Sequence, residues 1–189
     1  PKVNQFEEEF SNYVGSKYSC AVSSCTTALH IALLAVGVRP GDFVITVSHS
    51  FISTANSIRY CGAEPIFLDI DPSTYNITFE SIKRFIDEKC FIKNNELYCT
   101  DATMFYHKKS PLRYIKKDKN GRISAILPVH QIGMPCQIQK IVEIASNYNI
   151  PVVEDAACAI GSEIKNEGNW DKIGKPHGDI ACFSFHPRK

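Results

Sequence analysis

The sequence lacks an excess of charge of either sign, an apolar run long enough to cross a membrane, and any internal repeat or Gly/Ser-rich linker. Its 189 residues carry 21 Lys and Arg against 20 Asp and Glu, which gives a formal net charge of +1. This balance provides no general attraction to nucleic acid or to a membrane surface. A membrane helix needs about 20 apolar residues, and a domain commonly has about 100 to 200 residues. The sequence therefore predicts one globular domain, and we expect a cytoplasmic protein.

Several motifs of well-known enzyme classes are also missing. The chain contains neither the dinucleotide-binding pattern GxGxxG nor the phosphate-binding loop GxxxxGK[ST], which counts against nucleotide-dependent dehydrogenases and kinases. It has no GxSxG turn, so nucleophilic Ser-His-Asp or Cys-His chemistry has no local signature. His177, Cys182 and His186 lie close together, but their spacing matches no common zinc module and no CxxC pair occurs. We expect no metal site.

The eight cysteines could form a disulfide framework or remain free. Cys20, Cys61, Cys158 and Cys182 are placed within apolar segments, where a free thiol behaves as a small hydrophobic side chain. We therefore expect reduced thiols, as in other proteins of reducing compartments.

Positive charge is concentrated in the window from His107 to Arg122, which holds seven of the 21 basic residues and only one acid, Asp118. A nucleic-acid-binding patch is one interpretation of this window. However, Asn120-Gly121 is typical of a type I′ turn, and it lies between the apolar runs 112–115 and 122–127. A solvent-exposed β-hairpin is the favoured interpretation.

The rest of the chain alternates segments typical of strands with segments typical of helices. Unbroken apolar strands that alternate with helices predict an α/β fold, in which a mostly parallel sheet is covered by helices on both faces. Helix 26–36 is apolar nearly all round and is expected to be buried, whereas helix 79–88 is amphipathic and exposed. The predicted strands are 18–22, 43–47, 65–68, 126–129, 152–153 and 180–185, and the other predicted helices are 53–61 and 138–148.

Parallel sheets bind ligands at the carboxyl ends of their strands. The hydroxyl-rich segment 23–27 precedes a helix, where free N–H groups favour a phosphate, although ordinary helix capping is the simpler interpretation. Phe51 either stacks on a flat ring or belongs to the core. Asp155 ends a buried strand and needs a cation, because an unpaired buried charge is unfavourable. The last predicted strand leads to Ser184, His186 and Lys189.

A set of motifs in fixed order resembles one enzyme family. Glu-Asp-Ala-Ala followed by Phe-Ser-Phe-His-x-x-Lys is its most specific part. The chain resembles the DegT/DnrJ/EryC1/StrS family of pyridoxal-phosphate-dependent aminotransferases, which mostly act on nucleotide-linked keto sugars. The resemblance implies the large cofactor-binding domain of fold type I, the aspartate aminotransferase-like class, with three α/β/α layers. The matching segments are 6–10, 13–15, 22–30, 41–42, 69–72, 127–130, 153–157 and 178–189.

The resemblance implies roles for individual residues. Lys189 matches the catalytic lysine that forms a Schiff base with the cofactor. Asp155 matches the carboxylate that faces the pyridine nitrogen, which would be the cation that this position needs. Cys158 stands where many members have Gln or His in contact with the ring hydroxyl, and a thiol donates only weakly. Cys25 replaces the glycine of the usual phosphate turn. Thr26, Thr27 and Ser184 match phosphate contacts, and Phe51 matches the aromatic residue stacked on the ring.

The implied reaction is an amino transfer. An amino acid, expected to be glutamate, gives its amino group to the cofactor while Lys189 moves the proton, and a nucleotide-linked keto sugar then receives it. The product would be an amino sugar for a surface polysaccharide or a secondary metabolite. Family members are commonly homodimers with a shared active site. Two alternatives stay open: the sugar dehydratase branch, in which histidine replaces the lysine, and a cofactor-bound regulatory protein without turnover.

The resemblance also implies a domain organisation. It extends from about Phe6 to Lys189, apart from 89–122, which is expected to be an insertion carrying the basic hairpin. Residues 1–189 would form a cofactor-binding large domain without the family's N-terminal segment and C-terminal small domain. We expect this polypeptide to be inactive by itself.

Overall fold

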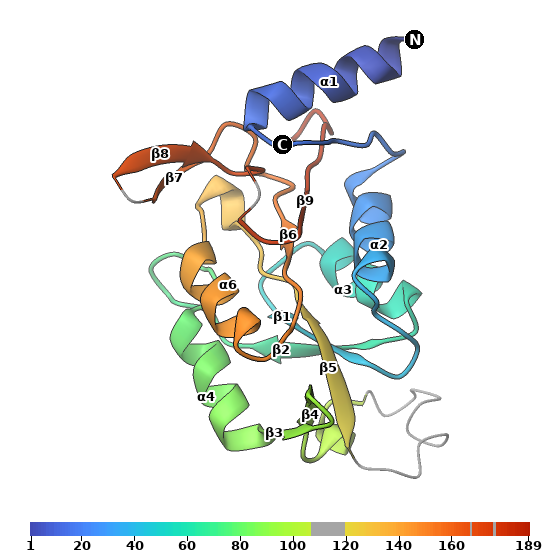
Figure 1. The fold of residues 1–189 in the computed structure, drawn as a ribbon, viewed down its shortest axis with the longest axis vertical. Helices are drawn as coiled ribbons and strands as arrows, with labels where there is room; N and C mark the ends of the chain where they lie inside the picture. The colour runs from blue at the N-terminus through green and yellow to red at the C-terminus, as the bar shows by residue number, and fades with distance from the viewer. Residues whose placement is uncertain (107–119, 167, 176) are drawn as a thin grey trace.

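In a computed structural model, which describes residues 1–106, 120–166, 168–175 and 177–189, a five-stranded sheet has the order β2-β1-β5-β4-β3 (Figure 1). Strand β1 pairs in parallel with β2 and β5, whereas β4 pairs antiparallel with β5 and β3. The mostly parallel sheet is thus confirmed, and an antiparallel hairpin extends one side of it. The strands are β1 (Phe43–Val47), β2 (Glu64–Leu68), β3 (Cys90–Lys93), β4 (Glu96–Cys99) and β5 (Gly121–Ile126).

Two short strands continue the parallel arrangement beyond β5. They are β6 (Val153–Asp155) and β9 (Ile180–Cys182), which pair in parallel with each other. Parallel bridges join Ile126 to Val152 and Val129 to Asp155, and the Asp155 N–H donates to the Pro128 carbonyl over 2.9 Å. Because β1, β6 and β9 run in one direction, their carboxyl ends meet at the same edge of the sheet.

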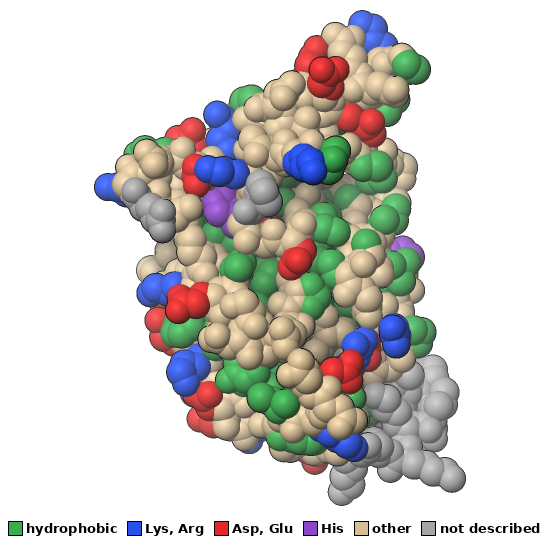
Figure 2. All heavy atoms as spheres, in the orientation of Figure 1, with side chains coloured by type: hydrophobic (Ala, Val, Ile, Leu, Met, Phe, Trp, Pro, Cys, Tyr) green, Lys and Arg blue, Asp and Glu red, His purple; other side chains and the backbone are tan. Residues whose placement is uncertain are grey.

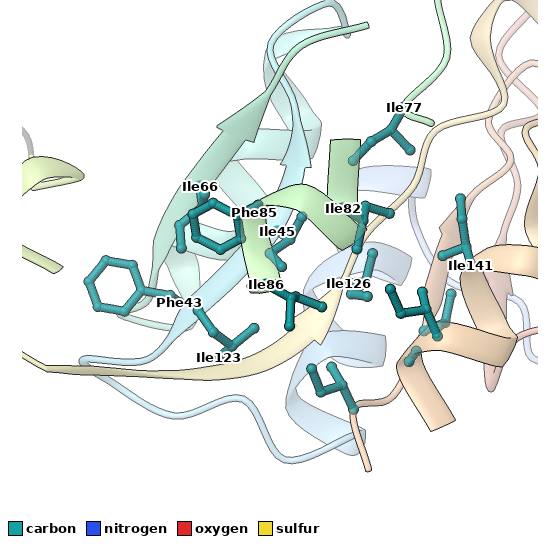
Figure 3. Close-up of a cluster of buried hydrophobic side chains, with 14 of the residues drawn as sticks. Phe43, Ile45, Ile66, Ile77, Ile82, Phe85, Ile86, Ile123, Ile126 and Ile141 are labelled. Atoms are coloured by element: carbon teal, nitrogen blue, oxygen red, sulfur yellow. The ribbon is translucent and has the colours of Figure 1, made fainter. Parts of the chain in front are cut away.

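Helices cover both faces of this sheet. The apolar residues of β1 alternate between the faces: Val44 packs with α2 and α3, whereas Phe43 and Ile45 pack with α4 and α6 in the cluster of Figure 3. This alternation confirms the three-layer architecture. The helices are α1 (Lys2–Val14), α2 (Cys25–Ala35), α3 (Ile52–Tyr60), α4 (Phe79–Lys89) and α6 (Ile138–Ser146), with 3-10 turns η1 (Ala102–Met104) and η2 (Gln131–Gly133).

Helix α1 lies across the end of the molecule where the C-terminus is found (Figure 1). Its Phe10 ring meets Phe183 and Phe185 edge to face, with centroid separations of 5.1 and 5.2 Å. Such aromatic pairs stabilise packing beyond the burial of their area. The segment after β9 is therefore held against α1.

Three expectations about local structure are wrong. Residues 18–22 form no strand; this segment runs beside α1, where the Ala21 N–H donates to the Glu7 carboxylate over 2.7 Å. Helix α2 is not buried all round, because Ile31 and Leu34 are each 48% exposed. Cys20 and Cys158 are exposed rather than enclosed by apolar side chains. Apolar composition alone overestimated burial in these cases.

The predicted basic hairpin falls largely outside the described residues, since its first arm and most of its positive charges lie within 107–119. Its predicted second arm lies largely in β5, but the type I′ turn predicted at Asn120-Gly121 is wrong, because Gly121 is the first residue of this strand, pairs with Cys99 of β4 and has no positive φ. Beyond the residues drawn in grey, acidic and basic side chains are interspersed on the face shown in Figure 2.

Three features were not predicted from the sequence: helix α1, the β3–β4 pair, and a second hairpin made of β7 (Glu163–Asn166) and β8 (Asn169–Lys172). Each of these four strands has only four residues, which leaves little apolar pattern to recognise, although Leu97 and Cys99 of β4 are buried. Within the part of the chain that the structure describes, the helices are too short or too polar to cross a membrane.

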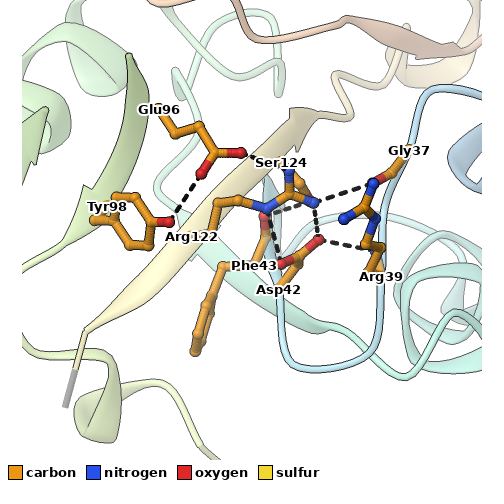
Figure 4. A network of polar contacts seen from close by, with 8 residues as sticks. All are labelled: Gly37, Arg39, Asp42, Phe43, Glu96, Tyr98, Arg122 and Ser124. Atoms are coloured by element: carbon orange, nitrogen blue, oxygen red, sulfur yellow. Dashed lines mark hydrogen bonds and ion pairs between the residues drawn. The ribbon is translucent and has the colours of Figure 1, made fainter. Parts of the chain in front are cut away.

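A polar network fastens the β3–β4 hairpin to the rest of the sheet (Figure 4). The guanidinium of Arg122 in β5 donates to both carboxylate oxygens of Asp42, to the Gly37 carbonyl over 3.0 Å, and to Glu96 of β4 over 3.2 Å. Tyr98 also donates to Glu96 over 2.9 Å. The hydrogen bonds that Arg122 donates to Asp42 raise the pKa of Arg122 further above its usual value, so the arginine stays charged.

We expect Asp42→Ala to lower the free energy of unfolding by about 3 kcal/mol, because it leaves the Arg122 charge partly buried and without its bidentate partner. Urea denaturation measures this change. The matched control is Asp87→Ala, which removes an exposed ion pair with Lys83 on α4 and should change stability by less than about 1 kcal/mol. Equal effects of the two substitutions would contradict the account.

Candidate active site

Four segments that are far apart in the sequence meet at the carboxyl edge of the parallel strands. They are the start of α2, the turn between β1 and α3, the residues after β6 and the residues after β9. In Figure 1, β6 and β9 lie near the middle of the view, with α2 and α3 beside them. The residues that the sequence analysis singled out are distributed over these segments.

Asp155 is the last residue of β6 and is only 3% exposed. Its Oδ2 accepts a hydrogen bond from the Thr54 hydroxyl over 2.7 Å, and its Oδ1 accepts from the Ala157 N–H over 3.2 Å. Burial raises the pKa of Asp155, and the hydrogen bond from Thr54 opposes that rise. Among the described residues no ion pair compensates this carboxylate, so the site suits a ligand that brings a cationic N–H.

The start of α2 presents hydroxyl groups beside free backbone N–H groups. Ser24 is the N-cap, whose Oγ accepts the Thr27 N–H over 3.1 Å and lies 3.0 Å from the Thr27 hydroxyl. Thr26 and Thr27 are half-buried in the first turn of the helix. Helix capping is thus confirmed, and it leaves the helix dipole and the remaining N–H groups able to attract an anion.

Cys25 is the first residue of α2 and stands where the family's usual phosphate turn has a glycine. Burial, reinforced by the Asp155 carboxylate, raises the pKa of this thiol to about 12, although the Lys189 ammonium opposes the rise. The thiol is therefore neutral at physiological pH. It contacts the Cys182 carbonyl over 3.6 Å, so it packs toward β9.

Phe51 and Lys189 lie next to each other at this edge. The Phe51 ring is 69% exposed, which places it outside the core, and the Lys189 Nζ is 5.6 Å from the centroid of this ring. The same Nζ lies 3.4 Å from the Sγ of Cys158. An amine thus stands over an exposed aromatic face, an arrangement suited to a flat ligand that reacts with an amine.

The chain reaches Lys189 through a tight turn after β9. Ser184 is buried, and its Oγ accepts the His186 N–H over 3.3 Å. The Lys189 N–H then donates to the His186 carbonyl over 2.9 Å. The structure therefore places Ser184 and Lys189 on one turn at the edge that holds Asp155.

A buried polar pair that the sequence analysis did not single out supports this edge. The His130 Nδ1 accepts the Cys136 N–H over 3.1 Å, so its Nε2 carries the proton that it donates to Glu154 over 2.9 Å. Glu154 also accepts the Gly178 N–H over 2.8 Å. A Cβ at Gly178 would lie 2.7 Å from the Val152 carbonyl, so the close approach requires glycine.

The fold and site define a three-layer α/β protein whose candidate ligand site lies at the carboxyl edge of a mostly parallel sheet. A sequence model of the DegT/DnrJ/EryC1/StrS aminotransferase family matches residues 1–189, and the chain belongs to this family. It is 37% identical over 189 residues to the spore coat polysaccharide biosynthesis protein SpsC of Bacillus subtilis. It is 35% identical over 187 residues to the GDP-perosamine synthase of Caulobacter vibrioides.

These two alignments cover 100% and 99% of this chain, but the chain spans only 39% and 40% of the length of the relatives. Solved structures of related proteins have the same fold. An aminotransferase of this family from Brucella abortus superposes with a TM-score of 0.77 at 29% identity, over all of this chain and 42% of that chain. The ntda protein of Bacillus subtilis, solved with bound cofactor PMP, has a TM-score of 0.65 at 31% identity, over 90% of this chain and 31% of that one.

Because burial raises the pKa of Asp155, the folded state binds the proton of this carboxyl more tightly than the unfolded state does. Stability therefore falls as the pH rises from the pKa of Asp155 in the unfolded state to its pKa in the folded state. We expect Asp155→Asn to raise the free energy of unfolding of the cofactor-free protein by about 0.5–2 kcal/mol at neutral pH. The advantage should disappear in acid, where Asp155 itself is neutral. Urea denaturation at several pH values measures it, and a pH-independent difference would contradict this account.

Proposed function

We propose that the complete protein is a pyridoxal-phosphate-dependent aminotransferase that moves an amino group from glutamate to a nucleotide-linked keto sugar. The observation that carries the proposal is the buried Asp155 carboxylate, which forms no ion pair with the described residues and lies at the same edge as the Lys189 amine. The family membership of the chain supports it.

The residues at this edge fit each part of such a cofactor. Asp155 would face the pyridine nitrogen and hold its proton, since a buried carboxylate favours a cationic neighbour. The exposed Phe51 ring would stack on one face of the cofactor. Thr26 and Thr27 at the start of α2, with Ser184 after β9, would hold the phosphate.

When bound, the cofactor supplies an electron sink for the electrons released at the substrate α-carbon. Lys189 would provide the amine that anchors the cofactor and, once released, takes the proton from the donor α-carbon. Its Nζ lies above the Phe51 ring, so a ligand stacked on Phe51 brings its reactive carbon within reach of this amine. Asp155 would keep the ring protonated throughout and so maintain its electron-accepting state.

The substrate class rests on the relatives. One is a GDP-perosamine synthase and another is a spore coat polysaccharide biosynthesis protein, which together support an amino sugar destined for a polysaccharide. Cys158, which lies beside Lys189 where other members carry Gln or His, would face the ring hydroxyl and contribute a weak donor. We place the enzyme in the cytoplasm as a homodimer, as the family resemblance implies.

A transamination assay on the complete gene product tests the proposal. Glutamate and a panel of nucleotide-linked 3-keto and 4-keto sugars are the substrates, and 2-oxoglutarate and amino sugar are measured. We expect Lys189→Ala to bind cofactor but to lose turnover by roughly 10²-fold or more, because the proton-transfer group is gone. The control Lys140→Ala, on the exposed face of α6, should retain full activity.

Cofactor binding by the unmodified protein without amino transfer from any donor would contradict the enzymatic proposal and favour a regulatory protein. Turnover that survives in Lys189→Ala would contradict the assignment of the lysine.

A further inference from the structure

A chain of two hydroxyl groups ends on the Asp155 carboxylate, and the proposed chemistry leaves it unused. The Thr54 Oγ1 lies 2.7 Å from the Asp155 Oδ2, and the Ser50 Oγ lies 2.5 Å from the Thr54 Oγ1. Thr54 is only 1% exposed, whereas Ser50 is half-buried within the turn between β1 and α3. These hydrogen bonds therefore connect the half-buried Ser50 to the buried Asp155 carboxylate through Thr54.

The directions of these hydrogen bonds follow from the charge of Asp155. An ionised carboxylate only accepts, so Thr54 donates its single hydroxyl proton to Asp155. The Thr54 oxygen then accepts from Ser50, which acts as the donor. Hydrogen bonds arranged in this way polarise one another, so Ser50 strengthens the donation by Thr54.

Thr54 acts on both the charge and the orientation of Asp155. Burial disfavours the ionised form, and the Thr54 hydroxyl is the strongest of the interactions that favour it. With Thr54 on one oxygen and the Ala157 N–H on the other, rotation of the carboxylate is restricted. The remaining lone pairs of the Asp155 carboxylate oxygens therefore keep a fixed direction.

The same residue connects Asp155 to the aromatic side of the site. Thr54 lies in the first turn of α3, and its N–H donates to the Phe51 carbonyl over 3.1 Å. The side chain of Thr54 thus fastens the turn that carries Phe51 to the end of β6. Phe51, which is proposed to stack on the cofactor ring, and Asp155, which is proposed to face the ring nitrogen, are therefore kept at a fixed separation.

We propose that Thr54, supported by Ser50, is the positioning residue that keeps Asp155 ionised and directed at a cationic N–H of the bound ligand. This inference rests on the proposed function, because it takes the ligand to be a pyridoxal-type ring. Neither hydroxyl touches the reacting atoms in this role.

Binding of pyridoxamine phosphate to the cofactor-free complete protein tests the inference, because this probe forms no bond to Lys189. Its dissociation constant is measured by calorimetry from neutral to mildly acidic pH. Thr54→Val keeps the shape of the side chain and removes the hydroxyl. We expect its affinity at mildly acidic pH to be lower than that of the unmodified protein by roughly 10-fold or more. The loss of affinity should be smaller at neutral pH. Protonation of Asp155 competes with binding of the probe, and less of Asp155 is protonated at neutral pH than in mild acid.

Three further variants make the result specific. Thr54→Ser retains a hydroxyl and should restore the original pH profile, and Ser50→Ala should shift it in the direction of Thr54→Val by a smaller amount. The matched control is Ser57→Ala, which removes another buried hydroxyl of α3, one that donates to the Thr54 carbonyl and does not contact Asp155. It should leave the profile unchanged.

A profile in Thr54→Val equal to that of the unmodified protein would overturn the inference, while the proposed function would stand. If Thr54→Val does not fold, an unshifted profile in Ser50→Ala overturns the inference instead. A probe that does not bind the unmodified protein at any pH would contradict the proposed function itself.

Discussion

The burial of one carboxylate is the constraint on which this site depends. Asp155 ends β6 in an environment that disfavours its charge, and its hydrogen bonds come from a hydroxyl and an amide rather than from a cation. An uncompensated charge of this kind destabilises the ligand-free fold, and binding of a cationic ligand would offset that cost. The residues around Asp155 are held in place by hydrogen bonds. Strand β6 pairs on both sides, and the neighbouring Glu154 accepts hydrogen bonds from His130 and from the Gly178 amide.

The topology of the sheet explains how distant residues reach this carboxylate. Parallel strands end at one edge, so the turn after β1 and the turn after β9 both approach the end of β6, and α2 contacts β6 and β9 with its apolar side. The packing of α1 on Phe183 and Phe185 then restrains the segment that leads to Lys189. A helix start with hydroxyl groups, an aromatic face, a carboxylate and an amine are thereby brought together, each from a different segment of the chain.

Strands β1 and β2 could be predicted from sequence because their apolar runs are unbroken, whereas the strand predicted at 126–129 overlaps β5 by only one residue. The prediction for β1 matches Phe43–Val47, and that for β2 differs by one residue. The strand predicted at 18–22 was wrong, since hydrogen bonds to Glu7 hold that segment against α1, a tertiary contact that no local pattern encodes. The candidate site residues were found through motifs at strand ends. Thr54 was not, because a threonine in the first turn of a helix is ordinary until the fold places Asp155 beside it.

The central claim is that the amine of Lys189 and the carboxylate of Asp155 belong to one pyridoxal-phosphate site. Borohydride reduction of the complete protein mixed with pyridoxal phosphate, followed by peptide mass spectrometry, tests it most directly, because reduction fixes the cofactor to the lysine that holds it. We predict a single labelled lysine, Lys189, and loss of that label in Asp155→Ala at limiting cofactor. Label on another lysine, or labelling of Lys189 that does not depend on Asp155, would contradict the account.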